Sequence, residues 1–396
     1  MSELRSTLLL VVALPVKAAV FLVSLLFPRD DRLWVFMAGD GDRFADNAKY
    51  LFVHCADRDD VRNVWVGTND EVIEQLRAAG YEAYSTRSWR GRSVMLRAGV
   101  FFETHGPIAP EYTGRARVIH LTHGNYLKTM LADHTRDWPW PVELAVELFF
   151  ERRRRFVVTG AGPPAANMQS MRGISRDRLL VTGFPRNDVL LSNLPDARLG
   201  VDESALDAVT AAAREGPVLI FAPTYRTGYG ECNGVPMHDL SFGFDDLERV
   251  LAERDATLYL SLHPDATFDT DLSPYEHVHR LDTGGDLYPF LTHADALVTD
   301  YSGIFYDYLL LDRPIVFYAP DLEAYTRDRA LYFDYEDHVP GPIARDPDDF
   351  ADAIRAVLDG EDDHASDRAH VREAFYDQPD GNASERVYRA VLEDLS

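Results

Sequence analysis

The alternation of short apolar runs with helical stretches constrains the fold of this chain more than any other feature. In the first half, buried strands are predicted at Leu33–Met37, Asn63–Val66, Val100–Glu103, Val118–Leu121, Phe156–Thr159 and Leu179–Val181. Helices are predicted between them at Asp70–Ala79, Trp89–Ala98 and Pro163–Met171. Strands that alternate with helices are typical of parallel sheets covered on both faces, so an α/β fold is expected.

A second series of the same kind follows a polar, weakly patterned stretch at Ser192–Gly216, which is predicted to be a linker. Its elements are strands at Val218–Phe221, Leu258–Leu262, Ala296–Val298 and Ile315–Tyr318, and helices at Asp245–Arg254, Tyr288–Thr292, Gly303–Leu311 and Pro347–Leu358. Two such units place a cleft between them, where ligands bind at the carboxyl ends of the strands. Glu373–Leu395 is predicted to be a helical tail that returns to the first unit.

The beginning of the chain differs in kind from the rest. Thr7–Phe27 is apolar except for Pro15 and Lys17, and its 21 residues are enough for a membrane-spanning helix. Lys17 in its middle favours a helix that lies at the membrane surface instead. A buried helix and a removable signal peptide are the alternatives, although no small-x-small cleavage site follows. The predicted division is a membrane-associated helix at 1–28, α/β units at 29–200 and 201–372, and the tail at 373–396.

Composition limits the possible partners. The net charge of −25 argues against a nucleic-acid-binding protein, because phosphate contacts require a basic face. Lys17, Lys49 and Lys128 are the only lysines, and an acidic surface poor in lysine is typical of a protein from a halophile. The two cysteines, Cys55 and Cys232, are too few for a disulfide framework or a cysteine-rich metal site. No P-loop and no G-x-G-x-x-G opening a helix after the first strand is present.

Five segments place polar, reactive side chains directly after an apolar strand. They are residues 118–128 (VIHLTHGNYLK), Gly183–Asp188, Phe221–Arg226, Leu260–Pro264 and Val298–Tyr308. In the first, Gly124 permits a close backbone approach while His123 faces the cleft. In the second, a turn is expected to aim Arg186 outward. Thr224 and Arg226 of the third suit phosphate oxygens.

The fourth and fifth segments complete the predicted site. His263 ends the strand at Leu258–Leu262, and Asp300 ends the strand at Ala296–Val298. Ser302 is expected to be the N-cap of the helix that follows, and the free N–H groups at that helix start would bind an anion.

Taken together, these segments resemble the CDP-glycerol glycerophosphotransferase family, whose enzymes build the polyol-phosphate chains of teichoic acids. The family motif H-G-T-P-L-K appears as His123–Lys128, and the motifs A-P-T-[FYW]-R and G-[YF]-P-R-N-D are intact at Ala222–Arg226 and Gly183–Asp188. R-L-H-P appears as Ser261–Pro264 and T-D-Y-S-S as Thr299–Gly303. Asp307–Asp321, Tyr332–Tyr335, Pro340–Pro342 and the N-P-K-Y-like Asn47–Leu51 add to a resemblance that covers roughly residues 33–390.

The resemblance implies a GT-B-like fold, in which two Rossmann-like domains face each other across a cleft and the C-terminal one holds the nucleotide. It implies transfer of glycerol phosphate, or a related polyol phosphate, from CDP-glycerol to a hydroxyl group, with release of CMP. His123 would be the base, and His263 would bind the pyrophosphate and assist the leaving group. Donor-binding roles fall on Gly124, Asn125, Lys128, Arg186, Thr224, Tyr225, Arg226, Ser261, Asp300, Ser302, Gly303 and Asp307.

No metal or other cofactor is expected. The expected acceptor is a lipid-linked saccharide or a polyol-phosphate polymer, and the expected location is the cytoplasmic face of the cell membrane. Two alternatives remain: a GT-B glycosyltransferase that uses a nucleotide sugar, and a non-catalytic subunit of a surface-polymer assembly. Binding of cytidine nucleotides would favour the glycerophosphotransferase hypothesis over both alternatives.

Overall fold

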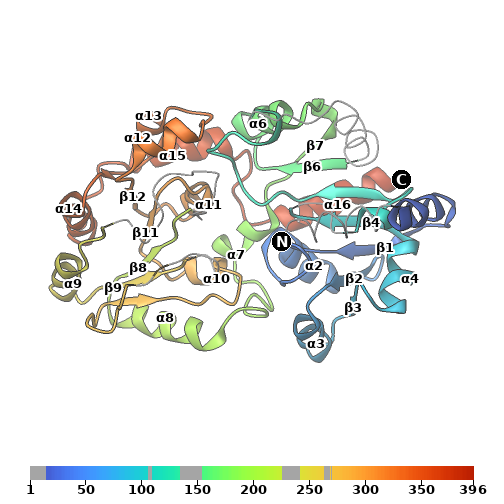
Figure 1. The fold of residues 1–396 in the computed structure, drawn as a ribbon, viewed down its shortest axis with the longest axis horizontal. Helices are drawn as coiled ribbons and strands as arrows, with labels where there is room; N and C mark the ends of the chain where they lie inside the picture. Colours follow the sequence, from blue (N-terminus) through green and yellow to red (C-terminus); the bar gives the residue numbers. More distant parts are fainter. Residues whose placement is uncertain (1–14, 106–108, 134–153, 225–240, 263–267, 269) are drawn as a thin grey trace.

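In the computed structural model, residues 15–105, 109–133, 154–224, 241–262, 268 and 270–396 are described. These residues form two parallel β-sheets, which lie on the right and on the left of Figure 1. The first sheet has seven strands in the order β3-β2-β1-β4-β5-β6-β7. They are β1 (Asp30–Phe36), β2 (Arg62–Gly67), β3 (Ala83–Ser85), β4 (Ala98–Glu103), β5 (Arg117–His120), β6 (Arg154–Val158) and β7 (Leu179–Val181).

The central strands of the first sheet are buried on both faces, as expected for parallel strands covered by helices. Every residue of β4 is buried, and its Phe102 ring stacks with Phe36 of β1 and meets Trp34 at a tilt. The helices of this part are α2 (Asp46–Ala56), α3 (Asp70–Ala78), α4 (Trp89–Arg97), α6 (Pro163–Arg172) and α7 (Asp188–Leu191). Side-chain caps begin two of them: Asn69 accepts from Glu71 N–H in α3, and Ser88 accepts from Gly91 N–H in α4.

The second sheet has six strands in the order β10-β9-β8-β11-β12-β13. They are β8 (Val218–Phe221), β9 (Thr257–Leu260), β10 (Val278–Arg280), β11 (Ala296–Thr299), β12 (Ile315–Tyr318) and β13 (Ile343–Ala344). The accompanying helices are α8 (Glu203–Glu215), α9 (Phe244–Ala252), α10 (Tyr288–Leu291), α11 (Ile304–Tyr308), α12 (Leu322–Asp328), α13 (Tyr335–His338), α14 (Pro347–Leu358) and α15 (Ala365–Phe375). Apolar clusters lie on both faces of this sheet.

The two sheets share a topology that fixes where a ligand can bind. In each sheet, the first three strands in chain order lie side by side in that order. The fourth strand pairs with the opposite edge of the first strand. The order therefore reverses between β1 and β4 in the first sheet and between β8 and β11 in the second. Ligands of doubly wound sheets bind outside the carboxyl ends of the strands at such a switch point. The loops after these four strands are thus the expected places for function.

The chain ends by returning to its first sheet. Helix α16 (Ala383–Leu395) lies under that sheet, where Val387, Tyr388 and Val391 join the core that contains Trp34 and Phe36. The carboxylate of Asp188 accepts hydrogen bonds from the N–H groups of Ala383 and Ser384 at 2.8 Å each. Helix α16 therefore belongs to the core of the first sheet.

Most predicted elements are confirmed, and three local predictions are wrong. Ser192–Gly216 is not only a linker, because α8 occupies Glu203–Glu215, with its N-cap Asp202 accepting from Ala205 N–H. Glu373–Leu395 is not one helix, because α15 ends at Phe375 and α16 begins at Ala383, with Pro379 and Gly381 in between. Ser302 is not an N-cap, because Gly303 holds that position before the five-residue helix α11. The short edge strands β3, β10 and β13 were not anticipated.

The N-terminal prediction is met only in part. Residues 15–26 form a helix, while residues 7–14 of the predicted apolar segment lie outside the described residues. Among the described residues, no helix has the length and apolar character that crossing a membrane requires. The domain boundaries predicted at residues 28, 200 and 372 stay predictions.

Candidate active site

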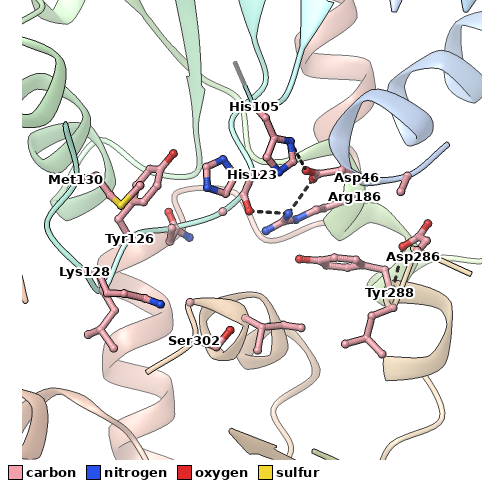
Figure 2. Close-up of a pocket in the computed structure, with 18 of the residues that line it drawn as sticks. Asp46, His105, His123, Tyr126, Lys128, Met130, Arg186, Asp286, Tyr288 and Ser302 are labelled. Carbon is pink, nitrogen blue, oxygen red and sulfur yellow. Dashed lines mark hydrogen bonds and ion pairs between the residues drawn. The ribbon is translucent and has the colours of Figure 1, made fainter. Parts of the chain in front are cut away.

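A pocket of about 590 Å³ lies at the carboxyl ends of the strands and takes its lining from both sheets (Figure 2). The first sheet contributes residues from the loops after β1, β4 and β5 and from the turn after β7. The second contributes the segment before α10 and the start of α11. The side chains that matter below are Asp46, His105, His123, Asn125, Tyr126, Lys128, Arg186, Asp286, Tyr288, Ser302 and Arg329, together with Gly124 and Gly303.

His123 projects from a backbone that is bent sharply on both sides of it. Thr122, just after β5, has φ of +57°, and Gly124 has φ of +143°. A Cβ atom at Gly124 would lie 2.9 Å from the guanidinium of Arg186, so both the conformation and the space require glycine there. Left-handed backbone at a non-glycine residue costs free energy and is concentrated at functional sites. The loop is shaped to present the imidazole to the pocket.

Two neighbouring rings hold the His123 imidazole. His105 stacks parallel to it, with ring centroids 4.7 Å apart, and Tyr126 meets it edge-on at 5.5 Å. The carboxylate of Asp46 lies 4.0 Å from Nδ1 of His105, on the side of the pocket formed by the start of α2. Asp46 also has a positive φ, of +62°. The pocket therefore contains two imidazoles and a carboxylate brought together from three separate loops.

His120 fixes this arrangement from below and does not face the pocket. Its Nε2 is 2.6 Å from the carbonyl oxygen of His105, and its Nδ1 accepts a hydrogen bond from the N–H of Thr122. One nitrogen therefore donates and the other accepts, which describes a neutral ring. Burial, with the nearby Arg172 and Arg154, lowers the pKa of His120 well below its ordinary value. His120 thus joins the loop that carries His105 to the loop that carries His123.

The pocket keeps His123 neutral. Burial, together with the nearby His105, lowers the pKa of His123 to about 4, although Asp46 acts in the opposite direction. For Asp46, burial alone would raise the pKa of the carboxyl group, but Arg186, His105 and His123 lower it below its ordinary value. At neutral pH the structure thus holds an ionised carboxylate beside an unprotonated imidazole, which can accept a proton.

Arg186 links the two sheets and is not aimed outward, which corrects the expectation from its turn. Its side chain is 7% exposed, and its guanidinium donates to Asp46 at 2.8 Å, to Asp307 at 2.6 Å and to the carbonyl oxygen of His123 at 2.8 Å. Burial alone would lower the pKa of Arg186, but Asp307, Tyr288 and Asp46 raise it well above its ordinary value. The residue remains charged and holds the His123 loop against the second sheet.

The second sheet approaches this loop through Gly303. A Cβ atom there would lie 2.4 Å from the carbonyl oxygen of Asn125, so the absence of a side chain allows the two loops to touch. Asn125 is itself held from below by Thr159 at 2.9 Å and Tyr376 at 3.3 Å. The Ser302 side chain lies beside this contact in Figure 2.

Lys128 and Thr224 form a second contact between the sheets. The ammonium group of Lys128 donates to the hydroxyl of Thr224 at 3.3 Å, directly after β8. The N–H of Thr224 in turn donates to the carboxylate of Asp300, after β11, at 2.7 Å. The two loops at the switch point of the second sheet are therefore joined to each other and, through Lys128, to the first sheet.

The structure places the predicted site residues in four groups. The pocket lining includes His123, Gly124, Asn125, Lys128, Arg186, Ser302 and Gly303. Thr224 and Asp300 lie behind Lys128, and Asp307 lies behind Arg186. Ser261 follows β9, where its N–H donates to the carbonyl oxygen of Phe221, and it is not part of the lining. His263, Tyr225 and Arg226 fall outside the described residues.

Sequence reasoning missed Asp46, His105, Tyr126 and Tyr288. A signal existed for two of them, because His105 follows β4 and Asp46 precedes the N-P-K-Y-like segment, so both come after strands at the switch point. Among the described residues, no group of three His, Cys, Asp or Glu side chains could hold a metal ion. The prediction that the reaction needs no metal stays a prediction.

Comparison with known proteins shows that the chain is similar to proteins of teichoic acid synthesis. The "Teichoic acid glycerol-phosphate transferase" of Staphylococcus aureus is 26% identical over 381 residues, which are 90% of this chain and 92% of that protein. The "Teichoic acid ribitol-phosphate primase" of Bacillus spizizenii is 33% identical over 215 residues, about half of each chain. A structure of the wall teichoic acid polymerase TagF, a variant soaked with CDPG, matches with a TM-score of 0.78 at 21% identity and covers 100% of this chain and 99% of that one.

The structural match supports the fold, since its sequence identity is low. The family assignment comes from a sequence model described as CDP-Glycerol:Poly(glycerophosphate) glycerophosphotransferase, which matches residues 19–393. This range includes every residue described in the pocket and both sheets. The chain therefore belongs to the CDP-glycerol:poly(glycerophosphate) glycerophosphotransferase family and is a transferase.

Proposed function

We propose that this chain transfers glycerol phosphate from CDP-glycerol to a hydroxyl group in the synthesis of a teichoic-acid-like polymer, and that the reaction takes place in the pocket at His123. The observation that carries the proposal is the neutral, tightly held imidazole of His123 at the junction of two doubly wound sheets. Family membership supports the donor and the reaction class. The relatives' names, which include glycerol-phosphate and ribitol-phosphate transfer, leave the polyol to experiment.

In the proposed reaction, an acceptor hydroxyl oxygen attacks the phosphorus atom that carries the glycerol. The bond from that phosphorus to the CMP oxygen breaks, and CMP leaves with its electron pair. His123 takes the proton of the acceptor hydroxyl, which its unprotonated state at neutral pH permits. Asp46 stabilises the imidazolium that forms, because it is ionised and lies beside the paired imidazoles.

The charge of the donor fits the cations around the pocket. Its lining contains Arg43, Lys128, Arg186 and Arg329, against the carboxylates of Asp46 and Asp286. Asp286 is paired with Lys49 at 2.7 Å, Arg186 is paired with Asp46 and Asp307, and Arg43 is paired with Asp42. In a chain of net charge −25, a lining with more cationic than acidic side chains, including Lys128 and Arg329, favours a diphosphate ligand. Phosphoryl transfer depends mainly on positioning and on stabilising such charge.

The finer predictions are part of the same proposal. Two Rossmann-like domains would face each other in the GT-B manner, with the nucleotide held mainly by the second sheet. The acceptor would be lipid-linked or polymeric, and the chain would act at the cytoplasmic face of the membrane. Exposed apolar side chains on helix 15–26 support a membrane location.

The deciding experiment measures CMP release from CDP-glycerol, CDP-ribitol and UDP-N-acetylglucosamine with the purified chain and a panel of acceptors. CMP release from CDP-glycerol with growth of the acceptor by one glycerol phosphate is expected. UDP release with no turnover of either CDP compound would contradict the proposal and favour a glycosyltransferase. No turnover on any acceptor together with no binding of CDP-glycerol would favour a non-catalytic subunit.

A further inference from the structure

One stretch of the first sheet has a charge opposite to that of the rest of the molecule. Acidic residues number 65 among 396, yet residues 83–102 contain none. The same stretch carries four arginines, Arg87, Arg90, Arg92 and Arg97, and a tryptophan, Trp89. This composition covers all of α4 and the residues around it. In so acidic a chain, a cluster of this kind creates a local positive field on one face.

The structure places these side chains on the outer side of α4 and, for Arg87, in the turn before it. Val94 and Met95 face the core between α4 and the sheet, and Gly91 sits so close to the carbonyl oxygen of Ser85 that a Cβ atom would lie 2.1 Å from it. The helix is therefore fixed in one orientation. All four arginines are exposed, and Trp89 is 86% exposed, which is unusual for so large an apolar side chain.

The carboxylates nearest in sequence are occupied elsewhere. Glu82 pairs with Arg62, Glu103 with Arg154, and Glu111 with Lys17. Among the described residues, no carboxylate forms an ion pair with Arg87, which precedes α4, or with Arg90, Arg92 and Arg97 of α4. Their charge is directed to solvent.

The N-terminal helix adds apolar surface beside α4 (Figure 1). The guanidinium of Arg29 donates to the carbonyl oxygens of Met95 and Ala98 at the end of α4, and to that of Ser24 in helix 15–26. Ser24 is fully buried, so this side of the helix is fixed to the protein. The other side exposes Val16, Leu22, Val23 and Leu26, the last at 86%.

We propose that α4 and helix 15–26 together form a membrane-docking surface that selects anionic lipids. Arginine guanidinium groups bind lipid phosphates, and an exposed tryptophan enters the interface between headgroups and chains. The apolar side of helix 15–26 enters the same layer. The acidic remainder of the chain is repelled by an anionic surface, so the arginines also determine which face turns toward it. This inference deepens the proposed membrane location and rests on it.

The test measures binding of the full chain to vesicles by flotation, at the lowest salt that keeps it folded. Vesicles of phosphatidylglycerol and phosphatidylcholine are compared with vesicles of phosphatidylcholine alone. The variant is R90E/R92E, and the matched control is R249E/R355E, which changes two exposed arginines on α9 and α14 by the same charge. Because each arginine near an anionic surface contributes about 5-fold to binding, the α4 variant should bind anionic vesicles at least about 25-fold more weakly.

The remaining measurements separate the possible outcomes. The control should keep wild-type binding, and added salt should weaken the wild type more than the α4 variant. Unchanged binding of R90E/R92E to anionic vesicles, or an equal loss by the control, would overturn the proposal. A loss of binding to soluble polyphosphate with vesicle binding intact would assign the surface to a polymer and overturn it too. CMP release with a water-soluble acceptor should be the same for both variants as for the wild type. If the proposed transfer reaction is wrong, the wild type itself will release no CMP, whatever its binding to vesicles.

Discussion

The two sheets have the same strand order and opposite chemistry at their switch points. The loops after β1 and β4 carry Asp46 and His105, and the next strand, β5, leads to His123. The loops after β8 and β11 carry the hydroxyl groups of Thr224 and Ser302, and Asp300 there is used to hold Thr224 N–H. One switch point collects two imidazoles and a carboxylate, groups that can accept and hold a proton, and the described residues of the other present groups that donate or accept hydrogen bonds.

This difference teaches that repeating a topology does not repeat a function. A doubly wound sheet determines where a ligand binds, and the loop residues determine what happens to it. If the first sheet supplies the proton acceptor and the second holds the donor, variants of the two switch points should fail in different ways. The following predictions test whether the two sheets have these separate roles.

The largest effect is expected for His123→Ala. A lost general base lowers turnover by at least ~100-fold, or roughly 3 kcal/mol of barrier, while affinity for CDP-glycerol stays within about 3-fold of wild type. Turnover, donor affinity by calorimetry and melting temperature are measured on the same preparation. His279→Ala, an exposed histidine of β10, is the control and should behave as wild type. A folded His123→Ala protein with more than about a third of wild-type turnover would refute the role as base.

Arg186→Met is expected to lower the free energy of unfolding by an amount comparable to the barrier change at His123. The substitution leaves the carboxylates of Asp46 and Asp307 buried without their shared cation, which costs about 3–5 kcal/mol. The free energy of unfolding by urea measures this cost. Arg186→Lys should recover only part of it, because an ammonium group cannot reach both carboxylates in the same geometry. Unchanged stability of Arg186→Met would show that the two sheets are not held together at this point.

A smaller effect is expected at the second switch point. Ser302→Ala and Thr224→Val each remove a hydroxyl group that we place with the donor, so CDP-glycerol should bind about 5-fold more weakly, with turnover at saturation nearly unchanged. Calorimetry and steady-state kinetics measure the two quantities. A fall in turnover at saturating donor, with affinity intact, would break the separation between the sheets.

The smallest effect concerns pH. His123 must be unprotonated to act, so kcat/KM should fall as the pH drops through its pKa of about 4, and not through 6.5. His105 lowers that pKa, so His105→Asn should move the acid limb upward by less than about one pH unit. Because the folded-state pKa lies below the unfolded value, the contribution of His123 to stability is lost as the pH falls from 6.5 toward 4. A downward shift of the limb in His105→Asn would contradict the assignment.

The sequence was sufficient for the periodic elements and insufficient for the contacts between them. Runs such as Val218–Phe221 and Ile315–Tyr318 are strands with the predicted bounds, because a short β-branched and aromatic run between polar residues has few other stable forms. Edge strands such as β13, of only two residues, have no pattern long enough to recognise. Helix α8 was missed because its alanine-rich sequence reads as weakly patterned, although burial of Leu206 and Val209 fixes it.

For the site, the motif around His123 was enough to place the imidazole in the pocket. The neighbours of His123 in the pocket could not be predicted in the same way, because Asp46 and His105 are distant in sequence from His123 and from each other. The prediction that Arg186 points outward was wrong for a related reason. The two carboxylates that bind Arg186 come from α2 and α11, and no local sequence pattern reveals them. Gly303 stands where the family motif has a second serine, and the nearby carbonyl oxygen of Asn125 leaves no room for a side chain there.

The return of α16 to the first sheet has a consequence for how the protein is made. His54 of α2 and Glu385 of α16 meet at 3.0 Å although 331 positions separate them in the chain. On the ribosome, the first sheet emerges long before the helix that covers it, so its apolar face at Trp34 and Phe36 stays uncovered while the second sheet is synthesised. The first half of the protein therefore depends on its last residues, and removal of α16 should release the nascent chain in an aggregation-prone form.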